Sequence, residues 1–352
     1  SPAPTVAPTA TSGVHDIDMD GDYRAEMTSG HALLGDDSDY LGAAIRAVGD
    51  FNGDGIDDLL VGASNMKMPA DQDPRGGAYL ILGTAGSAPG DPDVDLASFA
   101  AGNAAGFRIF GPHVGAFVGD AIGGGGDFNN DGFADIIIGA QGYSETRMYQ
   151  GAVYVIYGHD GTTSPFVNVQ LEFFTTGSAG FLMVGLVAGD RLGTSVSNAG
   201  DVNSDTFDDI IACAPYANPD RSNSAGICYV IFGQAAPFAE NINLAPDSFT
   251  DSTTRGFIIT TTAGNTQLGK SVSGGFDFNK DGHSDVIVGS NKHSQYSRDF
   301  AGAAFVIFGH ESTYNFVTVN TAGFSSSGTV GVMIMGAAES DGWAEFAASA
   351  GD

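Results

Sequence analysis

The chain has 352 residues and a formal net charge of −29 at pH 7, from 42 acidic and 13 basic side chains. Such an acidic chain is a poor partner for nucleic acid or an anionic membrane surface, because both attract positive charge. Glycine accounts for 52 residues and only 16% are charged, which favours turns and tight strands over helical bundles, and no apolar run approaches the roughly 20 residues of a membrane-spanning helix.

Residues 1–29 form the first predicted segment. They begin with SPAPTVAPTATSG, and this content of Pro, Thr and Ser predicts an extended arm that is a candidate for O-glycosylation, or a plain disordered tail. No signal peptide is present, so we interpret the sequence as a mature or partial chain. A degenerate Asp-rich segment follows at Asp16, Asp18 and Asp20, with Arg24 at its ninth position, and it predicts either a poor fifth metal site or a loop of an incomplete closing blade.

From residue 30 onward the sequence repeats itself four times. An acidic string recurs at intervals of 77, 74 and 76 residues, as DFNGDGIDDLLVGA from Asp50, DFNNDGFADIIIGA from Asp127, DVNSDTFDDIIACA from Asp201 and DFNKDGHSDVIVGS from Asp277. A Leu-Gly or Val-Gly pair precedes each string, and two apolar segments follow it, such as GGAYLILG and GFRIFG in the first repeat. Each repeat therefore predicts four short strands bounded by glycine, and no window has a convincing helical period.

Four strands per repeat are typical of a β-propeller blade. We therefore predict an all-β fold, a β-propeller of four-stranded blades with four complete repeats plus a partial closing blade. The predicted propeller covers residues 30–352, with repeats near 36–111, 112–185, 186–261 and 262–336 and a partial repeat at 337–352.

The two ends of this region do not form a complete blade. Residues 30–35 match the fourth-strand segments, and the C-terminal WAEFAASAGD matches a first strand that stops at Asp352, where a fifth acidic string would begin. The chain is then a fragment of a longer propeller, or its ends meet in one incomplete blade, or another copy supplies the missing strands. The last interpretation follows from the tendency of open sheet edges to recruit strands.

The repeats resemble the FG-GAP repeats of the integrin α-subunit propeller. Their Leu-Gly pairs stand where that family often has Phe-Gly, and Gly62-Ala63, Gly139-Ala140 and Cys213-Ala214-Pro215 stand at its Gly-Ala-Pro position. The resemblance covers about residues 30–352. It implies a calcium ion in the hairpin between the first two strands of each blade, and partner binding on the face away from these hairpins.

The chemistry of the acidic strings also predicts calcium sites. In the first string, Asp50, Asn52 and Asp54 offer side-chain oxygens at positions 1, 3 and 5, Ile56 a backbone carbonyl at position 7, and Asp58 a carboxylate at position 9. Hard oxygen donors in a flexible ring suit Ca²⁺. The equivalent predicted ligands are Asp127, Asn129, Asp131, Phe133 and Asp135; Asp201, Asn203, Asp205, Phe207 and Asp209; and Asp277, Asn279, Asp281, His283 and Asp285.

We expect about four structural Ca²⁺ ions, one in each loop, although an Asp/Asn-rich hairpin without metal is the alternative. The loops are not EF-hands, because Val61 stands where a bidentate Glu would be needed at position 12. At position 6 three loops have glycine and the third has Thr206. We expect Thr206 to weaken its loop, because a β-branched residue is strained at a positive φ.

No residue pattern points to catalysis, and we expect neither catalytic nor nucleotide-binding residues. Residues 264–271 match the phosphate-binding pattern GxxxxGK[ST], but that function requires a preceding strand and a following helix. Here the match contains the fourth Leu-Gly pair, which predicts a following strand. The seven histidines lack the spacing of a metal-binding motif, and no GxSxG sequence is present.

The two cysteines, Cys213 and Cys228, lie in the predicted second and third strands of the third repeat. A cross-strand disulfide is plausible if the strand register brings them opposite each other in an oxidising compartment. Two buried free thiols are the alternative.

These features predict an extracellular or cell-surface protein. We expect a calcium-stabilised structural or adhesive recognition module for a protein or glycan partner, with loops 65–75 and 142–150 as candidate contact surfaces. One alternative is a subunit that assembles with copies of itself into an extracellular filament or surface layer. Another is the non-catalytic propeller of a secreted hydrolase.

Overall fold

The computed structural model describes residues 33–35, 39–70, 72–85, 94–96, 99, 105–145, 147–161, 165–218, 224–235, 241–242, 244, 255–295, 298–311, 318–324, 330–342, 344 and 348. The N-terminal arm and the degenerate Asp-rich segment lie outside these residues.

The described residues form four antiparallel four-stranded blades, one for each predicted repeat. Blades 1 and 2 contain, in order, β2 (Leu41–Gly49), β3 (Asp58–Ala63), β4 (Gly77–Ile81) and β6 (Gly106–Phe110), and β7 (Val118–Gly126), β8 (Asp135–Ala140), β9 (Ala152–Ile156) and β11 (Gly180–Val184). Blades 3 and 4 contain β12 (Ser195–Gly200), β13 (Asp209–Ala214), β14 (Ile227–Ile231) and β15 (Gly256–Thr260), and β16 (Leu268–Phe276), β17 (Asp285–Ser290), β18 (Ala303–Ile307) and β20 (Gly331–Met335). The prediction of propeller blades is confirmed.

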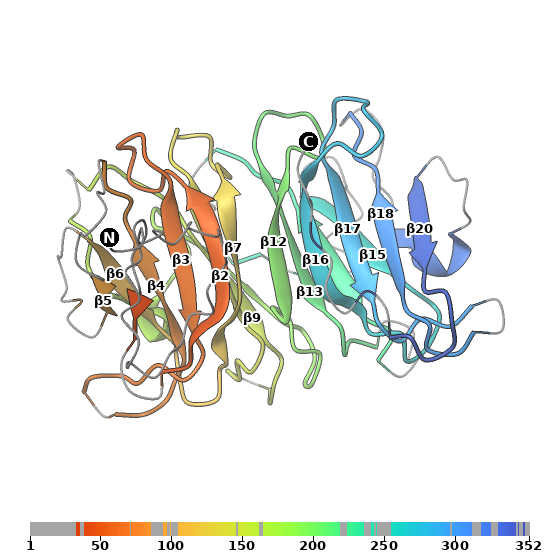
Figure 1. Cartoon of the computed structure of the whole chain (residues 1–352), viewed down its shortest axis with the longest axis horizontal. Helices are drawn as coiled ribbons and strands as arrows, with labels where there is room; N and C mark the ends of the chain where they lie inside the picture. The colour runs from red at the N-terminus through yellow and green to blue at the C-terminus, as the bar shows by residue number, and fades with distance from the viewer. Residues whose placement is uncertain are drawn as a thin grey trace, which may run out of the picture.

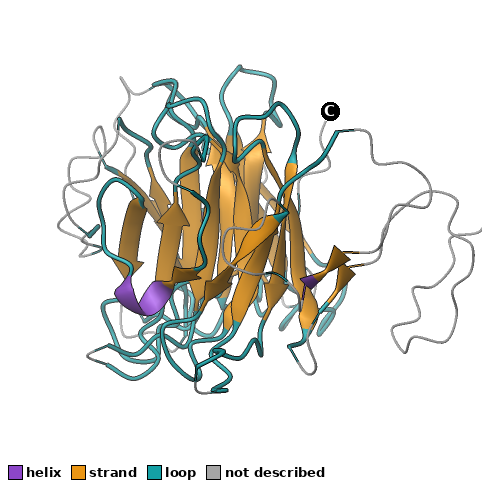
Figure 2. Cartoon of the chain, turned by 90° about the vertical axis from the view of Figure 1, so that its left-hand side faces the viewer, coloured by secondary structure: helices purple, strands orange, loops and turns teal. Residues whose placement is uncertain are grey.

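The four blades stand side by side in chain order, with their first strands β2, β7, β12 and β16 next to one another (Figure 1). Strands and loops make up nearly all of the described chain, with short 3₁₀ turns at η2 (Leu171–Phe173) and η4 (Thr321–Gly323) (Figure 2). The four sheets do not close into a ring.

Each pair of neighbouring blades shares its own hydrophobic core. A middle blade is covered on both faces, so its inner strands are continuous apolar runs; all six residues of β8 are buried. Alternate residues of one strand enter different cores: Ile136 faces blade 1 and Ile137 faces blade 3. The third core lies between blades 3 and 4 and includes Ile211, Phe257 and Phe305.

A short parallel pairing, which the sequence did not predict, links the fourth strands of blades 1 to 3 to the next repeat. β6 pairs with β10 (Val169–Gln170) and β15 with β19 (Val319–Asn320), while Met183 of β11 forms a single parallel bridge with Ile242. β1 (Leu33–Leu34) pairs in the same way with β5 (Val94–Asp95). β1 thus occupies the place of a fourth strand before blade 1, in agreement with the sequence similarity between residues 30–35 and the fourth-strand segments.

The C-terminal residues begin to repeat the pattern of a first strand. Ala344 has a φ of +67°, which is the left-handed conformation of Gly119 and Gly193 at the same repeat position. The Ser271 hydroxyl donates to the Ala344 carbonyl (3.2 Å), as the Ser195 hydroxyl of the preceding blade does to the Gly269 carbonyl (2.7 Å). These contacts support a fifth first strand at this place, although most of residues 343–352 lie outside the described part of the chain.

The cysteines form the cross-strand disulfide. Cys213 and Cys228 are direct partners in the register of β13 and β14, and their sulfurs are bonded in the core between blades 3 and 4. Gly269 of the phosphate-binding match packs onto this disulfide at a φ of +86°. Because Leu268–Phe276 is strand β16 and no helix follows, the match is not a phosphate-binding loop.

The disulfide is expected to contribute substantially to stability. It closes a loop with a sequence separation of 15, so replacing both cysteines by alanine should lower the free energy of unfolding by about 3 kcal/mol. Urea denaturation of the variant, followed by tryptophan fluorescence, measures this loss. Wild-type protein unfolded under reducing conditions is the control and should lose a similar amount; equal midpoints for all three samples would contradict the expectation.

Candidate metal centres

Each of the four acidic strings forms the hairpin between the first and second strands of its blade. Antiparallel strands alternate in direction, so all four hairpins lie at one end of the sheets. The connections from strand 2 to strand 3, and from strand 4 to the next blade, lie at the other end. The hairpins are therefore the place at which the FG-GAP resemblance expects calcium.

The side chains at positions 1, 3 and 5 converge on the turn of each loop. In the first loop, Asp50 accepts hydrogen bonds from the N–H groups of Asp54 (3.0 Å) and Gly55 (2.7 Å). Asn52 accepts from the Asp54 N–H through Oδ1 and donates to Asp54 Oδ2 through Nδ2, both at 3.0 Å, and Asp54 Oδ1 accepts from the Ile56 N–H at 2.9 Å. The other three loops repeat these five bonds at 2.7–3.1 Å.

This turn requires two residues with left-handed backbone in each loop. Position 6 has φ values of +86° at Gly55, +92° at Gly132, +78° at Thr206 and +91° at Gly282. The expected positive φ at Thr206 is confirmed. Position 4 is also left-handed, although its residue types differ between loops: Gly53, Asn130, Ser204 and Lys280.

Replacing Thr206 by glycine is expected to stabilise the chain by about 1 kcal/mol, because it removes the cost of a left-handed β-branched residue. The Thr206 N–H, which donates to Asp201 at 2.9 Å, is kept. The matched control is Gly132→Thr in the second loop, where an added Cβ has no neighbour within 4 Å, so that only the backbone penalty changes. Thermal denaturation should move in opposite directions for the two variants, and a destabilised Thr206→Gly would contradict the argument.

The carboxylate at position 9 is buried and accepts two backbone hydrogen bonds that hold its loop in place; we call this arrangement the clamp. Asp58 accepts from the Phe51 N–H at 2.8 Å and from the N–H of Gly83, just after the third strand, at 2.7 Å. Asp135, Asp209 and Asp285 make the same pair of bonds at 2.7–2.9 Å. All four carboxylates are at most 2% exposed. Each therefore fastens its loop to the end of the third strand of its own blade.

The loops also connect neighbouring blades. The Asp50 carbonyl accepts from the Ala134 N–H in the next loop, and the Phe51 carbonyl accepts from the His159 N–H, both at 3.0 Å. The same two bonds recur at the next two junctions, from Asp208 and Gln234 to the loop of blade 2 and from Ser284 and His310 to the loop of blade 3. The loops thus form a continuous hydrogen-bonded belt along one end of the four blades.

The acidic groups of one loop are close enough to repel one another. Burial raises the pKa of the position 9 carboxyl groups, to about 8 for Asp135, and the negative charges at positions 5 and 1 raise it further, while the two backbone hydrogen bonds lower it. The same causes raise the pKa of Asp58, Asp209 and Asp285. A cation in the loop would oppose this repulsion.

The residue types of each loop offer the oxygen donors that a hard cation such as Ca²⁺ prefers. Positions 1, 3 and 5 offer two carboxylates and one amide. In each loop the position 3 amide donates to the position 5 carboxylate, and the position 1 carboxylate accepts backbone N–H groups of the same turn. The position 9 carboxylate is turned toward backbone N–H groups, and across the described part of the chain no group of three or more His, Cys, Asp or Glu side chains is arranged to hold a metal. The position 7 residues Ile56, Phe133, Phe207 and His283 donate their N–H to position 5; the ligand role of their carbonyls stays a prediction.

Comparison with known proteins identifies these repeats. A family model described as FG-GAP repeat matches residues 45–80 and 118–156, which span strands β2–β4 and β7–β9. Integrin alpha-V of Gallus gallus is 26% identical over 271 residues, or 76% of this chain and 22% of that protein, and Integrin alpha pat-2 of Caenorhabditis briggsae is 30% identical over 262 residues, or 73% and 18%. Phosphatidylinositol-glycan-specific phospholipase D of Bos taurus is 33% identical over 108 residues, or 30% and 12%. The chain therefore carries FG-GAP repeats, resembles the integrin α propeller, and spans less than a quarter of these relatives.

Proposed function

We propose that this chain of FG-GAP repeats is a calcium-stabilised, non-catalytic propeller that acts outside the cell or on its surface as a structural or adhesive recognition module. The observation that carries the proposal is the belt of four acidic loops with one geometry, each joined to the next blade. Ions bound in such loops stabilise the junctions between blades as well as the hairpins themselves.

Calcium would be held in the first loop by Asp50, Asn52 and Asp54, with Asp58 behind them, and by the equivalent residues of the other three loops. Once bound, it neutralises carboxylates that otherwise repel one another. Isothermal titration calorimetry of the chelator-treated chain should give about four Ca²⁺ ions per chain. An absence of binding heat at millimolar calcium would overturn the metal part of the proposal.

An exposed apolar patch supports recognition at the opposite end of the blades. Its residues lie on connections from strand 2 to strand 3 and from strand 4 to the next blade, and their exposed fractions are 54% for Val114, 46% for Phe117, 70% for Met148, 40% for Tyr149 and 54% for Val187. Contiguous exposed apolar side chains are typical of contact surfaces. Of the two predicted contact loops, 142–150 contributes to this patch.

The recognition role is tested with a panel of purified matrix proteins and immobilised glycans. We expect the wild-type chain to bind at least one of them, and the double variant Met148→Ser with Tyr149→Ser to lose most of that binding. Phe173→Ser is the matched control, because Phe173 is 71% exposed in η2, outside the patch. Wild-type protein that binds no member of the panel, or equal losses in both variants, would argue against this surface.

The disulfide supports an extracellular location. The buried Cys213–Cys228 disulfide is stable in an oxidising compartment and uncommon in a reducing cytosol. Within the described ranges, no helix is both long and apolar enough to cross a membrane.

Self-assembly is a second candidate function, favoured by the exposed faces of the first and last blades. Ile45 of β2 is 51% exposed and Phe278 in the loop of blade 4 is 52% exposed. Their counterparts lie between blades at 7% exposure or less: Ile122, Val196 and Val272 for Ile45, and Phe51, Phe128 and Val202 for Phe278. A second copy that presents its blade 1 to blade 4 would cover both residues.

Sedimentation velocity over a range of concentrations tests this assembly. We expect larger species that disappear in Phe278→Asp and persist in the control Phe173→Asp. Monomers at all concentrations of the wild-type chain would exclude the second candidate.

A further inference from the structure

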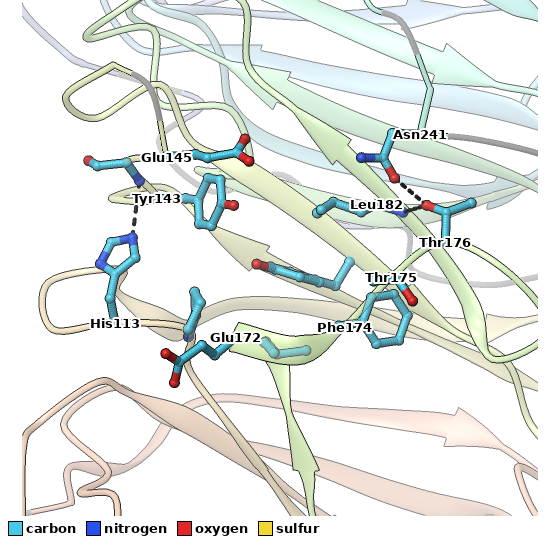
Figure 3. A pocket seen from close by; sticks show the side chains of 13 residues that line it. His113, Tyr143, Glu145, Glu172, Phe174, Thr175, Thr176, Leu182 and Asn241 are labelled. Carbon is cyan, nitrogen blue, oxygen red and sulfur yellow. Dashed lines mark hydrogen bonds between the residues drawn. The ribbon is translucent and has the colours of Figure 1, made fainter. Parts of the chain in front are cut away.

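A cavity of about 670 Å³ opens at the outer side of blade 2, where three blades contribute connections. Its lining includes His113 after blade 1, Tyr143 and Glu145 from the connection between β8 and β9, Phe174 after η2, and Asn241 from blade 3. Figure 3 shows His113, Tyr143 and Glu145 on one side of the cavity and Phe174 and Asn241 on the other. The volume is within the range of small-molecule sites.

Tyr154 of β9 offers a hydroxyl group to this cavity. Its side chain lines the cavity, the residue is only 1% exposed, and no hydrogen bond joins its hydroxyl to another described residue. The tyrosine at the same position of blade 1, Tyr79, donates to Asp39 at 2.9 Å. The Tyr154 hydroxyl is not one of the fully enclosed groups, so it can donate to or accept from a molecule that enters the cavity.

The aromatic walls around Tyr154 are fixed by packing. The Tyr154 ring makes edge-to-face contacts with Tyr143 at 6.4 Å and with Phe174 at 5.7 Å between centroids. The Tyr143 ring in turn contacts His113 at 5.5 Å. The Ser144 N–H donates to His113 Nε2 at 3.1 Å, which fixes the orientation of this ring. The walls are therefore aromatic rings held in one arrangement.

Polar groups are held at both sides of these rings. Asn241 Oδ1 accepts from the Thr176 hydroxyl, which accepts from the Leu182 N–H at 3.0 Å. This arrangement orients the Asn241 amide and keeps its N–H groups for a ligand. On the other side, Glu145 lies beside Tyr143 in the lining (Figure 3); burial raises the pKa of Tyr143 and the Glu145 charge raises it further.

The lining selects against two classes of ligand. Anions are repelled by Glu145 and Glu172 and by the net charge of −29, and Lys and Arg are absent from the described lining. A purely apolar ligand would leave the Tyr154 hydroxyl and the Asn241 amide without partners. The two carboxylates of the lining, Glu145 and Glu172, would attract an organic cation. Glu172 is already paired with Arg75 at 2.9 Å, however, so this attraction is weak.

We propose that this cavity binds a saccharide unit, with its apolar ring face against Tyr143 and Phe174 and its hydroxyl groups bonded to Tyr154, Asn241 and Glu145. A sugar ring combines apolar C–H faces with neutral hydroxyl groups that both donate and accept, which matches the fixed rings and the polar groups beside them. The inference rests on the proposed recognition role and assigns it a ligand class.

Saturation-transfer NMR and calorimetry on the calcium-loaded full chain test the proposal. The probes are the methyl glycosides of glucose, galactose, mannose and N-acetylglucosamine, with choline and inorganic sulfate as rival probes. We expect saturable binding of at least one glycoside, and Tyr154→Phe should weaken it about tenfold through the loss of one hydrogen bond.

Tyr157→Phe is the matched control. The Tyr157 hydroxyl likewise makes no hydrogen bond to a described residue, but it is fully buried and does not line the cavity, so binding should be unchanged. The proposal is overturned if no glycoside binds, if choline or sulfate binds more tightly, or if both variants weaken binding equally. A chain that binds calcium and matrix proteins but no glycoside would overturn this inference alone, and the recognition role would stand.

Discussion

Removal of calcium is expected to lower the melting temperature of the chain by about 10–20 °C. Each occupied site contributes about 2.7 kcal/mol of stability when free calcium is one hundred times the dissociation constant. Four such sites give about 10 kcal/mol, and one kcal/mol shifts the melting temperature of a large domain by about 1–2 °C. The effect should be large because each loop is bonded to the next blade, so that an empty loop weakens a junction as well as a hairpin.

Differential scanning calorimetry in calcium and in excess chelator measures this shift. Sodium chloride at matched ionic strength separates binding from the screening of a chain with a net charge of −29. Asp54→Ala should remove about one Ca²⁺ ion from the measured stoichiometry, whereas its neighbour Asp57→Ala should not, because Asp57 is exposed at position 8 and is not a predicted ligand. The same melting temperature with and without calcium would refute structural calcium.

The repeat pattern was sufficient to predict the blades. Four copies of four glycine-bounded segments gave the strands, and the loop alignment anticipated the left-handed backbone of Thr206 and rejected the phosphate-binding match at residues 264–271. The strands and the loop backbone are determined by residues close to each other in sequence. Each repeat therefore shows what to expect at the same position of the next repeat.

Features that depend on the packing of separate repeats could not be predicted in this way. The pairing of Ile109 with Val169 joins two-residue segments 60 positions apart, which carry no periodic signal. The sequence predicts that position 9 is a simple metal ligand. Its second role, as acceptor of a hydrogen bond from a glycine N–H, involves a residue that lies 25 positions after Asp58. The only sign of this bond in the sequence is the recurrence of a glycine after each third strand, at Gly83, Gly158, Gly233 and Gly309. The cavity at Tyr154 gathers connections from three blades and has no motif.

The substitution Asp135→Asn is expected to destabilise the chain by about 3–5 kcal/mol even in the absence of calcium. Both oxygens of Asp135 accept backbone hydrogen bonds, from Phe128 and from Gly158 at 2.9 Å each, and the side chain is fully buried. An asparagine has nearly the same shape but replaces one acceptor with an N–H₂ donor. That donor would face a backbone N–H, so two buried donors would lose their partners.

Urea denaturation in chelator separates this clamp from any role in metal binding, at a pH above the Asp135 pKa of about 8 so that the side chain is a carboxylate. Asp131→Asn is the matched control, because Asp131 is an exposed position 5 residue in the same loop, and its change should cost much less when calcium is absent. In calcium both variants also lose a predicted ligand, so each should cost more than in chelator while the difference between them remains. If Asp135→Asn and the wild-type chain unfold at the same urea concentration in chelator, the clamp contributes nothing, and position 9 is only a metal ligand. A large loss of stability in chelator would instead mean that the buried carboxylate holds the loop together before any ion binds. The side chain that is predicted to complete the coordination of the ion would then already fix the hairpin to the third strand of its blade.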